Sequence, residues 1–286
     1  MMAQSLKVAC VQLTTGPEPR QNLAAMIPLI HEAHQHGADF ITLPEVLDII
    51  EPRRPLVFDK AEPEDKHFIL QALRDTAASL GRWILAGSVV VKLGPEKLAN
   101  RSVLINDQGQ IVARYDKIHM FDVDLPDQPV YRESAAYQPG AAAIVAPTPW
   151  FTLGMSICYD IRFAYLYRAL AKAGAGVITI PAAFTHFTGT AHWHVLLRAR
   201  AIETGCFIIA PAQCGQNAPG RQTYGHSLIV APWGEVLAEA GDTPGVITAT
   251  LDLNRITQAR TMVPALTHDR HFTLTNMTKN TEILDK

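Results

Sequence analysis

The chain has 286 residues, of which 48% are hydrophobic and 18% charged, and its formal net charge is −2 at pH 7. A chain of this size can bury a large core, so we expect one domain over residues 1–286, with 261–286 as a polar C-terminal extension. The absence of a run of Lys or Arg argues against nucleic acid as a partner. No apolar run reaches the roughly 20 residues of a membrane span, and the first 13 residues do not resemble a secretory signal, so we expect a cytoplasmic protein without membrane contact.

The four cysteines are too few and too scattered for a disulfide framework in a chain of this length. They are Cys10, Cys158, Cys206 and Cys214, and no two form a C-x-x-C pair. We therefore expect reduced thiols, any of which is chemically available as a nucleophile.

Apolar runs rich in β-branched residues alternate along the chain with longer amphipathic ones, as is typical of a layered α/β protein. In the first half this pattern predicts helices at 22–36 and 64–80, and strands at 6–13, 40–43, 83–91, 102–106 and 111–115. Residues 117–149 are rich in Pro, Asp and Gly, and we interpret them as a long functional loop.

The second half repeats this order of elements. It predicts helices at 161–172 and 191–203, and strands at 151–157, 177–180, 207–210, 227–230, 236–239 and 246–251. We interpret the whole as two sheets packed face to face, with helices outside each sheet.

Three predicted strands are each followed by a reactive side chain: Glu45, Lys117 and Cys158. The carboxyl ends of strands are where sites assemble in α/β folds, because side chains there project from a rigid scaffold. Three unlike reactive groups in equivalent positions therefore suggest one site.

These groups suit amide hydrolysis through a covalent intermediate. A thiol attacks as the thiolate, which we expect the start of the helix after Cys158 and the charge of Lys117 to favour. Glu45 would move the protons, and Lys117 with the backbone N–H of Tyr159 would hold the oxyanion. Taken singly, each residue has a plainer interpretation: a packed thiol, a carboxylate at a helix start and a solvated loop charge.

Three segments decide between these interpretations, because they resemble, in order and spacing, the three signatures of the nitrilase superfamily. They are Leu43-Pro44-Glu45, the stretch from Tyr115 to Asp124, and the stretch from Ser156 to Phe163. The resemblance extends over residues 7–270. It implies a four-layer α-β-β-α sandwich, a Glu45-Lys117-Cys158 triad, no metal or organic cofactor, and a homodimer or larger homo-oligomer formed through the helices around the active site.

The same resemblance implies a second glutamate. Tyr131-Arg132-Glu133-Ser134, followed by Gln138-Pro139-Gly140, matches the stretch that carries it in this family. Glu133 would then orient Lys117 and the attacked carbonyl. Without the resemblance it would be an ordinary loop carboxylate.

Segments of the second half resemble two branches of the superfamily, the deaminated glutathione amidases and the omega-amidases of 2-oxoglutaramate. They include 182–185, 191–193, 197–203 and 224–227. The resemblance implies a small amide substrate that carries a 2-oxo acid carboxylate, which the guanidinium of Arg162 would bind. Phe184, Thr188 and His192 would line the pocket; their plainer roles are a core aromatic, a helix N-cap and a surface histidine.

Alternatives stay open at this point. The same triad serves omega-amidases, N-carbamoyl amide hydrolases and nitrilases. A more remote alternative is a binding module without catalytic activity. A metal hydrolase built on His186, His192 and His194 is disfavoured, because residues two apart on a helix point about 200° apart. His194 also departs from the branch, which usually has His-Trp-Glu where this chain has His192-Trp193-His194.

Overall fold

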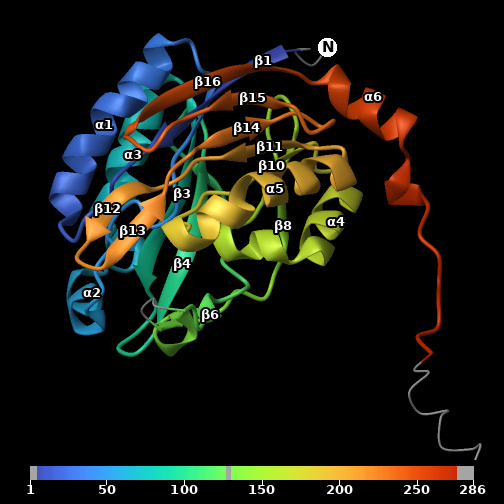
Figure 1. Ribbon diagram of the computed structural model, residues 1–286. Helices are drawn as coiled ribbons and strands as arrows, with labels where there is room; N and C mark the ends of the chain where they lie inside the picture. The colour runs from blue at the N-terminus through green and yellow to red at the C-terminus, as the bar shows by residue number, and fades with distance from the viewer. Residues whose placement is uncertain (1–4, 127–129, 276–286) are drawn as a thin grey trace, which may run out of the picture.

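The computed structural model describes residues 5–126 and 130–275. Two six-stranded sheets face each other, and helices cover the outer face of each, so that the described chain forms four layers (Figure 1). This arrangement confirms the predicted α-β-β-α architecture. Within the described ranges, no helix is long and apolar enough to cross a membrane.

The first sheet has the strand order β16-β1-β2-β3-β4-β5, and its outer face packs against α1 (Pro19–Gln35) and α3 (Phe68–Leu80). Strands β1, β2 and β3 are parallel to one another. The strand bounds are β1 Ser5–Gln12, β2 Phe40–Thr42, β3 Trp83–Lys92, β4 Leu98–Ile105, β5 Ile111–Asp116 and β16 Gly245–Asp252.

The second sheet has the order β15-β14-β11-β10-β9-β8 and packs against α4 (Ala164–Lys172) and α5 (His186–Thr204). Its strands β9, β10 and β11 are parallel. The bounds are β8 Ile144–Pro147, β9 Thr152–Met155, β10 Val177–Thr179, β11 Phe207–Ala210, β14 Leu228–Val230 and β15 Val236–Glu239.

The two-residue period of β1 explains why both faces of the first sheet are buried. Val8 and Cys10 point into the core between the sheets, while Ala9 and Val11 point outward into a second core under α1 and α3. Successive side chains of a strand alternate between faces, so an almost wholly apolar strand needs a cover on both sides. This explains why β1 lies in a middle layer, with the second sheet on one side and helices on the other.

Several elements differ from the predictions. Residues 117–149 are not one loop: they contain the short pair β6 (Asp122–Val123) and β7 (Tyr131–Arg132), and β8, the edge strand of the second sheet. An edge strand has one partner and stays half exposed, so β8 lacks a clear apolar pattern.

Four further differences concern single helices and one hairpin. The hairpin of β12 (Cys214–Ala218) and β13 (Arg221–Tyr224) and the helix α2 (Arg54–Lys60) were not predicted. The helix expected from residue 161 begins as a 3₁₀ turn at Cys158–Arg162, ahead of α4. Helix α6 (Asn254–Met262) crosses the expected start of the C-terminal extension, of which residues 276–286 lie outside the described chain.

Candidate active site

The three predicted reactive residues meet at one end of the two sheets. Glu45 lies three residues after β2 and Lys117 directly after β5, both in the first sheet, whereas Cys158 lies three residues after β9 of the second sheet. All three are buried, with 4%, 2% and 7% of their surface exposed. The site is therefore built across the interface between the sheets.

The backbone is strained at Cys158 and directly after Glu45. Cys158 and Val46, the residue after Glu45, both have φ of 46°, in the left-handed region that non-glycine residues rarely adopt. Hydrogen bonds hold both turns: the N–H of Cys158 donates to the Pro181 carbonyl at 2.9 Å, and that of Val46 to the Ser88 hydroxyl at 2.8 Å.

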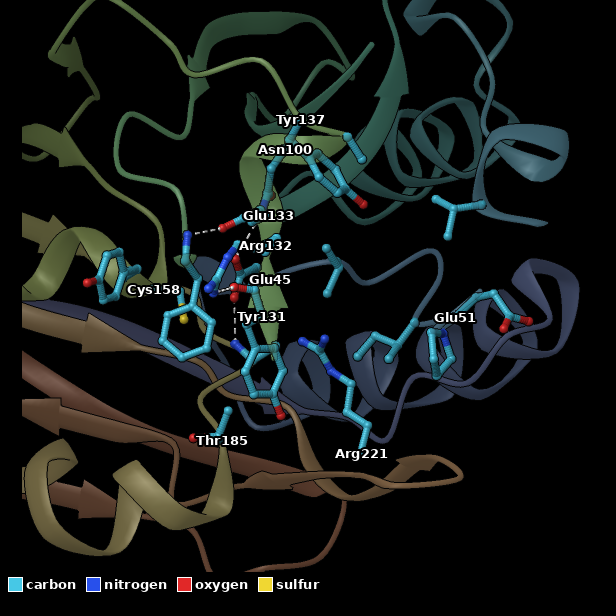
Figure 2. Close-up of a pocket in the computed structure, with 18 of the residues that line it drawn as sticks. Glu45, Glu51, Asn100, Tyr131, Arg132, Glu133, Tyr137, Cys158, Thr185 and Arg221 are labelled. Atoms are coloured by element: carbon cyan, nitrogen blue, oxygen red, sulfur yellow. Dashed lines mark hydrogen bonds between the residues drawn. The ribbon is translucent and has the colours of Figure 1, made fainter. Parts of the chain in front are cut away.

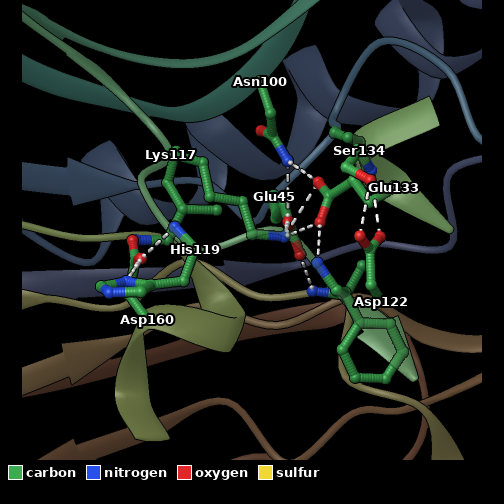
Figure 3. A network of polar contacts seen from close by, with 12 residues as sticks. Glu45, Asn100, Lys117, His119, Asp122, Glu133, Ser134 and Asp160 are labelled. Carbon is green, nitrogen blue, oxygen red and sulfur yellow. Dashed lines mark hydrogen bonds and ion pairs between the residues drawn. The ribbon is translucent and has the colours of Figure 1, made fainter. Parts of the chain in front are cut away.

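Lys117 lies between two carboxylates (Figure 3). Its Nζ is 2.9 Å from Oε1 of Glu45 and 3.0 and 2.8 Å from the two carboxylate oxygens of Glu133. The predicted second glutamate thus contacts the lysine directly. A buried ammonium with two carboxylate partners is held in one position and stays charged.

Three further donors fix the carboxylates. Asn100, on β4, donates through Nδ2 to Glu45 at 2.9 Å and to Glu133 at 3.2 Å. The backbone N–H of Ala183 donates to the other oxygen of Glu45, and that of Phe121 to Glu133, each at 2.7 Å. The sequence patterns did not predict a role for these residues. A buried Asn in strand β4 could have indicated a functional side chain. The sequence gives no sign of which backbone N–H groups donate to a carboxylate.

The ionisation of Cys158 differs from the expectation. Burial, and next the negative charge of Glu45, hold the pKa of its thiol well above the ordinary 9.0, although Lys117 acts in the opposite direction. Burial alone would raise the pKa of Glu45, but the charge and hydrogen bond of Lys117 bring it below 4.5. The resting site therefore pairs a thiol with a carboxylate. Lys117 favours the thiolate, as predicted, but burial and the charge of Glu45 outweigh its effect. The five-residue 3₁₀ turn at Cys158 is not the helix terminus that the prediction assumed.

Asp160 ties the two halves of the site together. Its fully buried carboxylate accepts hydrogen bonds from the Tyr115 hydroxyl at 2.6 Å and the Ile157 N–H at 2.9 Å. It also contacts Nδ1 of His119 at 2.6 Å. Because Tyr115 and His119 flank Lys117 while Ile157 precedes Cys158, this one side chain fixes the two turns relative to each other.

A cavity of about 440 Å³ opens onto the triad (Figure 2). Glu45, Lys117, Glu133 and Cys158 line it, together with the predicted pocket residues Tyr159, Phe184 and Thr188. A cavity of this size holds a small-molecule ligand.

Two predicted pocket residues lie just outside the cavity wall. Arg162 and His192 contact each other, with Nη2 of Arg162 3.2 Å from Nδ1 of His192. The Arg162 guanidinium also lies over the rings of Tyr159 and Phe184, 5.8 and 5.4 Å from their centroids. Arg162 thus packs behind two wall residues rather than facing the cavity.

Other arginines line the cavity itself. Arg132 pairs with Asp124, whereas Arg54 and Arg221 have no ion pair within the part of the chain that the structure describes. Figure 2 shows Arg221 and Arg132 beside Tyr131, near the triad. The cavity therefore combines a polar end at the triad with a largely apolar wall that carries three arginines and, at Glu51, one further carboxylate.

The three histidines considered for a metal hydrolase do not gather. In residues 5–126 and 130–275, the one group of three side chains with metal-ligand spacing is His194, His226 and Glu239, and none of these lines the cavity. His186 and His192 are not part of it.

Comparisons with known proteins agree with the amide hydrolysis that the triad suggests. The model of the carbon-nitrogen hydrolase family matches residues 7–261. A deaminated glutathione amidase of Yersinia enterocolitica is 38% identical over 270 residues, which cover 93% of this chain and 94% of the relative. The human deaminated glutathione amidase is 39% identical over 92% of this chain and 82% of its own length.

A solved structure shares the fold. That of Saccharomyces cerevisiae Nit3, a member of branch 10 of the nitrilase superfamily, superposes with a TM-score of 0.84 at 29% identity and covers 95% of this chain and 98% of that one. The chain therefore belongs to the carbon-nitrogen hydrolase family and is a hydrolase of carbon–nitrogen bonds other than peptide bonds.

Proposed function

We propose that the chain hydrolyses the amide bond of a small carboxylate-bearing substrate through a thioester on Cys158. One observation carries the proposal: a buried Lys117 lies between Glu45 and Glu133, beside a thiol that opens into a cavity. This is the arrangement that covalent amide hydrolysis needs, with nucleophile, base and cation in fixed positions.

In the proposed reaction, Sγ of Cys158 attacks the amide carbon while Glu45 takes the thiol proton. Lys117 and the N–H of Tyr159, which has no acceptor in the described chain, stabilise the oxyanion that forms. The tetrahedral intermediate collapses, the C–N bond breaks, and Glu45 returns the proton to the leaving amine. Glu45 then deprotonates a water that attacks the thioester, which releases the carboxylic acid and regenerates the thiol.

The test of this step is substitution of the nucleophile. Cys158→Ala should lower kcat by at least about 1,000-fold, because the covalent route is then closed. Cys214→Ala, at a buried cysteine outside the cavity, is the matched control and should keep its activity. Mass spectrometry of the quenched wild-type reaction should show the acyl group on Cys158. Full turnover by Cys158→Ala would refute the mechanism, and a wild type with neither turnover nor adduct would favour a binding module.

For the substrate we propose deaminated glutathione or a related 2-oxo acid amide, as the names of the relatives suggest. Deaminated glutathione carries one carboxylate on the acyl side of its amide and one on the amine side, whereas 2-oxoglutaramate carries only the first. Arg54 and Arg221 line the cavity and can contact a carboxylate directly, whereas Arg162, behind Tyr159 and Phe184, would attract one only at longer range. Bidentate arginine–carboxylate pairs give both affinity and orientation.

The two arginine positions can be separated by a substrate panel. Arg162→Ala should raise KM for both keto-amides more than for an uncharged amide. Arg221→Ala should raise KM about tenfold for deaminated glutathione and leave 2-oxoglutaramate unaffected, since about 1.4 kcal/mol of binding is lost with the second carboxylate only. If a substitution raises KM equally for charged and uncharged amides, the carboxylate-binding role of that arginine is refuted. Higher kcat/KM for 2-oxoglutaramate, N-carbamoyl amino acids or nitriles would select one of those alternative activities.

A further inference from the structure

Two histidines and a glutamate converge on the outer surface of the second sheet. Nε2 of His194 lies 2.9 Å and Nδ1 of His226 lies 3.0 Å from the same oxygen, Oε1 of Glu239. The three potential ligand atoms all lie within 4.8 Å of one another. Amide hydrolysis as proposed above uses none of these residues.

The three side chains come from three separate segments. His194 is on α5, His226 precedes β14, and Glu239 is the last residue of β15. A ligand shared by all three would therefore join the outer helix to the edge of the sheet beneath it. Figure 1 shows α5 next to the second sheet, where it contacts β11 and β14, with β15 on the other side of β14.

The position of His226 is fixed by its neighbours. Its N–H donates to the Gly241 carbonyl at 2.9 Å, and its carbonyl accepts a hydrogen bond of 2.8 Å from the indole of the buried Trp193. The ring of Tyr224 stacks on its imidazole with centroids 4.4 Å apart, and stands edge-on to His194 at 6.1 Å. The two imidazoles are thus held before any ligand arrives, which lowers the entropic cost of binding one.

The donor set matches a divalent transition-metal ion. Imidazole suits Zn²⁺, Cu²⁺, Ni²⁺ and Co²⁺, and two histidines with one carboxylate form a common three-ligand set that leaves a position for water. Tetrahedral bonds of about 2.0–2.1 Å separate ligand atoms by about 3.3 Å. The observed 2.9 and 3.0 Å would open by a few tenths of an ångström, which a rotation of the exposed Glu239 side chain provides.

We propose that His194, His226 and Glu239 form a binding site for a divalent transition-metal ion, with Zn²⁺ as its representative, separate from the amidase cavity. Bound metal would cross-link α5 to β15. Within the described chain, neither imidazole has a protein partner on its second ring nitrogen, so the site lacks the outer shell that strengthens metal binding, and we expect micromolar affinity.

The experiment is a calorimetric titration of the metal-free full-length chain with Zn²⁺. It is done on a Cys158→Ser background, since the active-site thiol is itself a zinc ligand. We expect one Zn²⁺ per chain and a melting temperature that rises with the Zn²⁺ concentration. His194→Ala, His226→Asn and Glu239→Gln should each weaken binding at least about tenfold. Asn is chosen at position 226 because it tolerates the φ of 55° found there.

The matched control is His192→Ala, which removes a histidine two residues away on the same helix but outside the cluster. It should leave the affinity unchanged. If the three cluster variants bind Zn²⁺ as the parent does, or if no Zn²⁺ binds once Cys158 is replaced, the proposal is overturned. Circular dichroism without metal checks that the variants are folded, and the isosteric Glu239→Gln guards against a loss of binding caused by misfolding. The readout is independent of amide hydrolysis, so this proposal and the proposed function can fail separately.

Discussion

The charges around Cys158 determine how its thiol reacts. Lys117 is one positive charge between the carboxylates of Glu45 and Glu133, so these three groups together carry a charge of −1. A standing thiolate would add a second negative charge to a buried site, which is costly. In the proposed mechanism the thiol therefore loses its proton to Glu45 only as it attacks. This differs from cysteine–histidine enzymes, in which an ion pair exists before the substrate binds.

The pH dependence of kcat/KM tests whether Glu45 takes the thiol proton during the attack. Glu45 accepts the proton as a carboxylate, and its pKa lies below 4.5, so activity should fall only when the pH drops through that lowered value. The pKa of Lys117 lies well above 10.5 and that of Cys158 well above 9.0, so the basic limb should also lie far from neutrality. We expect a plateau from about pH 5 to about pH 9. A limb centred between pH 6 and 8, with the protein shown to be folded by circular dichroism, would contradict the assignment of Glu45 as the base.

Asn100 is predicted to position both glutamates. Asn100→Leu keeps the approximate size but removes the donor shared by Glu45 and Glu133. We expect kcat to fall roughly 10- to 100-fold, because a hydrogen bond to a charged group contributes about 1.5–3 kcal/mol. Asn100→Asp should in addition move the acid limb of the pH profile upward, since a third carboxylate raises the pKa of Glu45.

Ser102→Ala is the matched control for Asn100. Ser102 lies two residues along β4 on the same face, is equally buried, and donates to the Ala86 carbonyl rather than to the triad. It should keep both kcat and the pH profile. A loss of activity in Asn100→Asp with an unmoved acid limb would reduce Asn100 to a purely structural residue.

At the scale of elements, Gly87 on β3 allows the strand ends that carry the site to approach each other. A Cβ at this position would lie 1.8 Å from the Leu43 carbonyl oxygen, 2.5 Å from that of Pro44 and 2.6 Å from Cβ of Pro181. Leu43 and Pro44 lead to Glu45, and Pro181 accepts the hydrogen bond from Cys158.

Gly87→Ala should therefore damage both stability and catalysis. Overpacking of this kind lowers the free energy of unfolding by about 1–3 kcal/mol, and we expect the upper end because two of the obstructing atoms are backbone oxygens. Urea denaturation and kcat measure the two effects. Gly94→Ala, in the turn after β3 where no heavy atom lies within 4 Å of the new methyl group, should change neither. An active, fully stable Gly87→Ala would show that the strand ends need not approach so closely.

How well an element can be predicted depends on whether it buries apolar side chains. Strand β11 lies where the sequence predicts it, at 207–210, and all four of its residues are apolar and buried. The hairpin β12–β13 was missed because its residues, such as Gln216 and Asn217, are mostly polar and hydrogen-bond within the hairpin and to the Thr15 carbonyl. A period-two search detects burial of apolar side chains, and it has no signal where pairing is carried by polar groups.

At the scale of the whole molecule, the sequence predicts the layers and the triad but not the assembly of the site. Glu45, Lys117 and Cys158 could be found because each follows an apolar strand, and Glu133 only through the family resemblance. The donor role of the Ala183 N–H and the entry of Arg221 into the cavity depend on how the second sheet packs on the first. Packing between distant segments also explains why Arg162 lies behind the cavity wall, a position that its distance along the chain from Cys158 does not predict.

The family resemblance implies a homo-oligomer formed through helices near the active site. Val195 and Ile202 are 67% and 57% exposed, and because they lie seven residues apart on α5 they share one side of the helix. Trp233, 51% exposed, is next to Gly234, where an added Cβ would lie 2.7 Å from Ile202. Exposed apolar residues that cluster in this way are typical of a contact surface rather than of scattered surface positions.

In light scattering after gel filtration we expect the chain to have at least twice its mass of 31.3 kDa. Val195→Glu with Ile202→Glu should return it to the single-chain mass, because carboxylates are depleted from interface cores. Val112→Glu, at a valine 44% exposed on β5 of the other sheet, should leave the oligomer intact. A wild type of single-chain mass, or a double variant that still elutes as the oligomer, would place the contact elsewhere or exclude it.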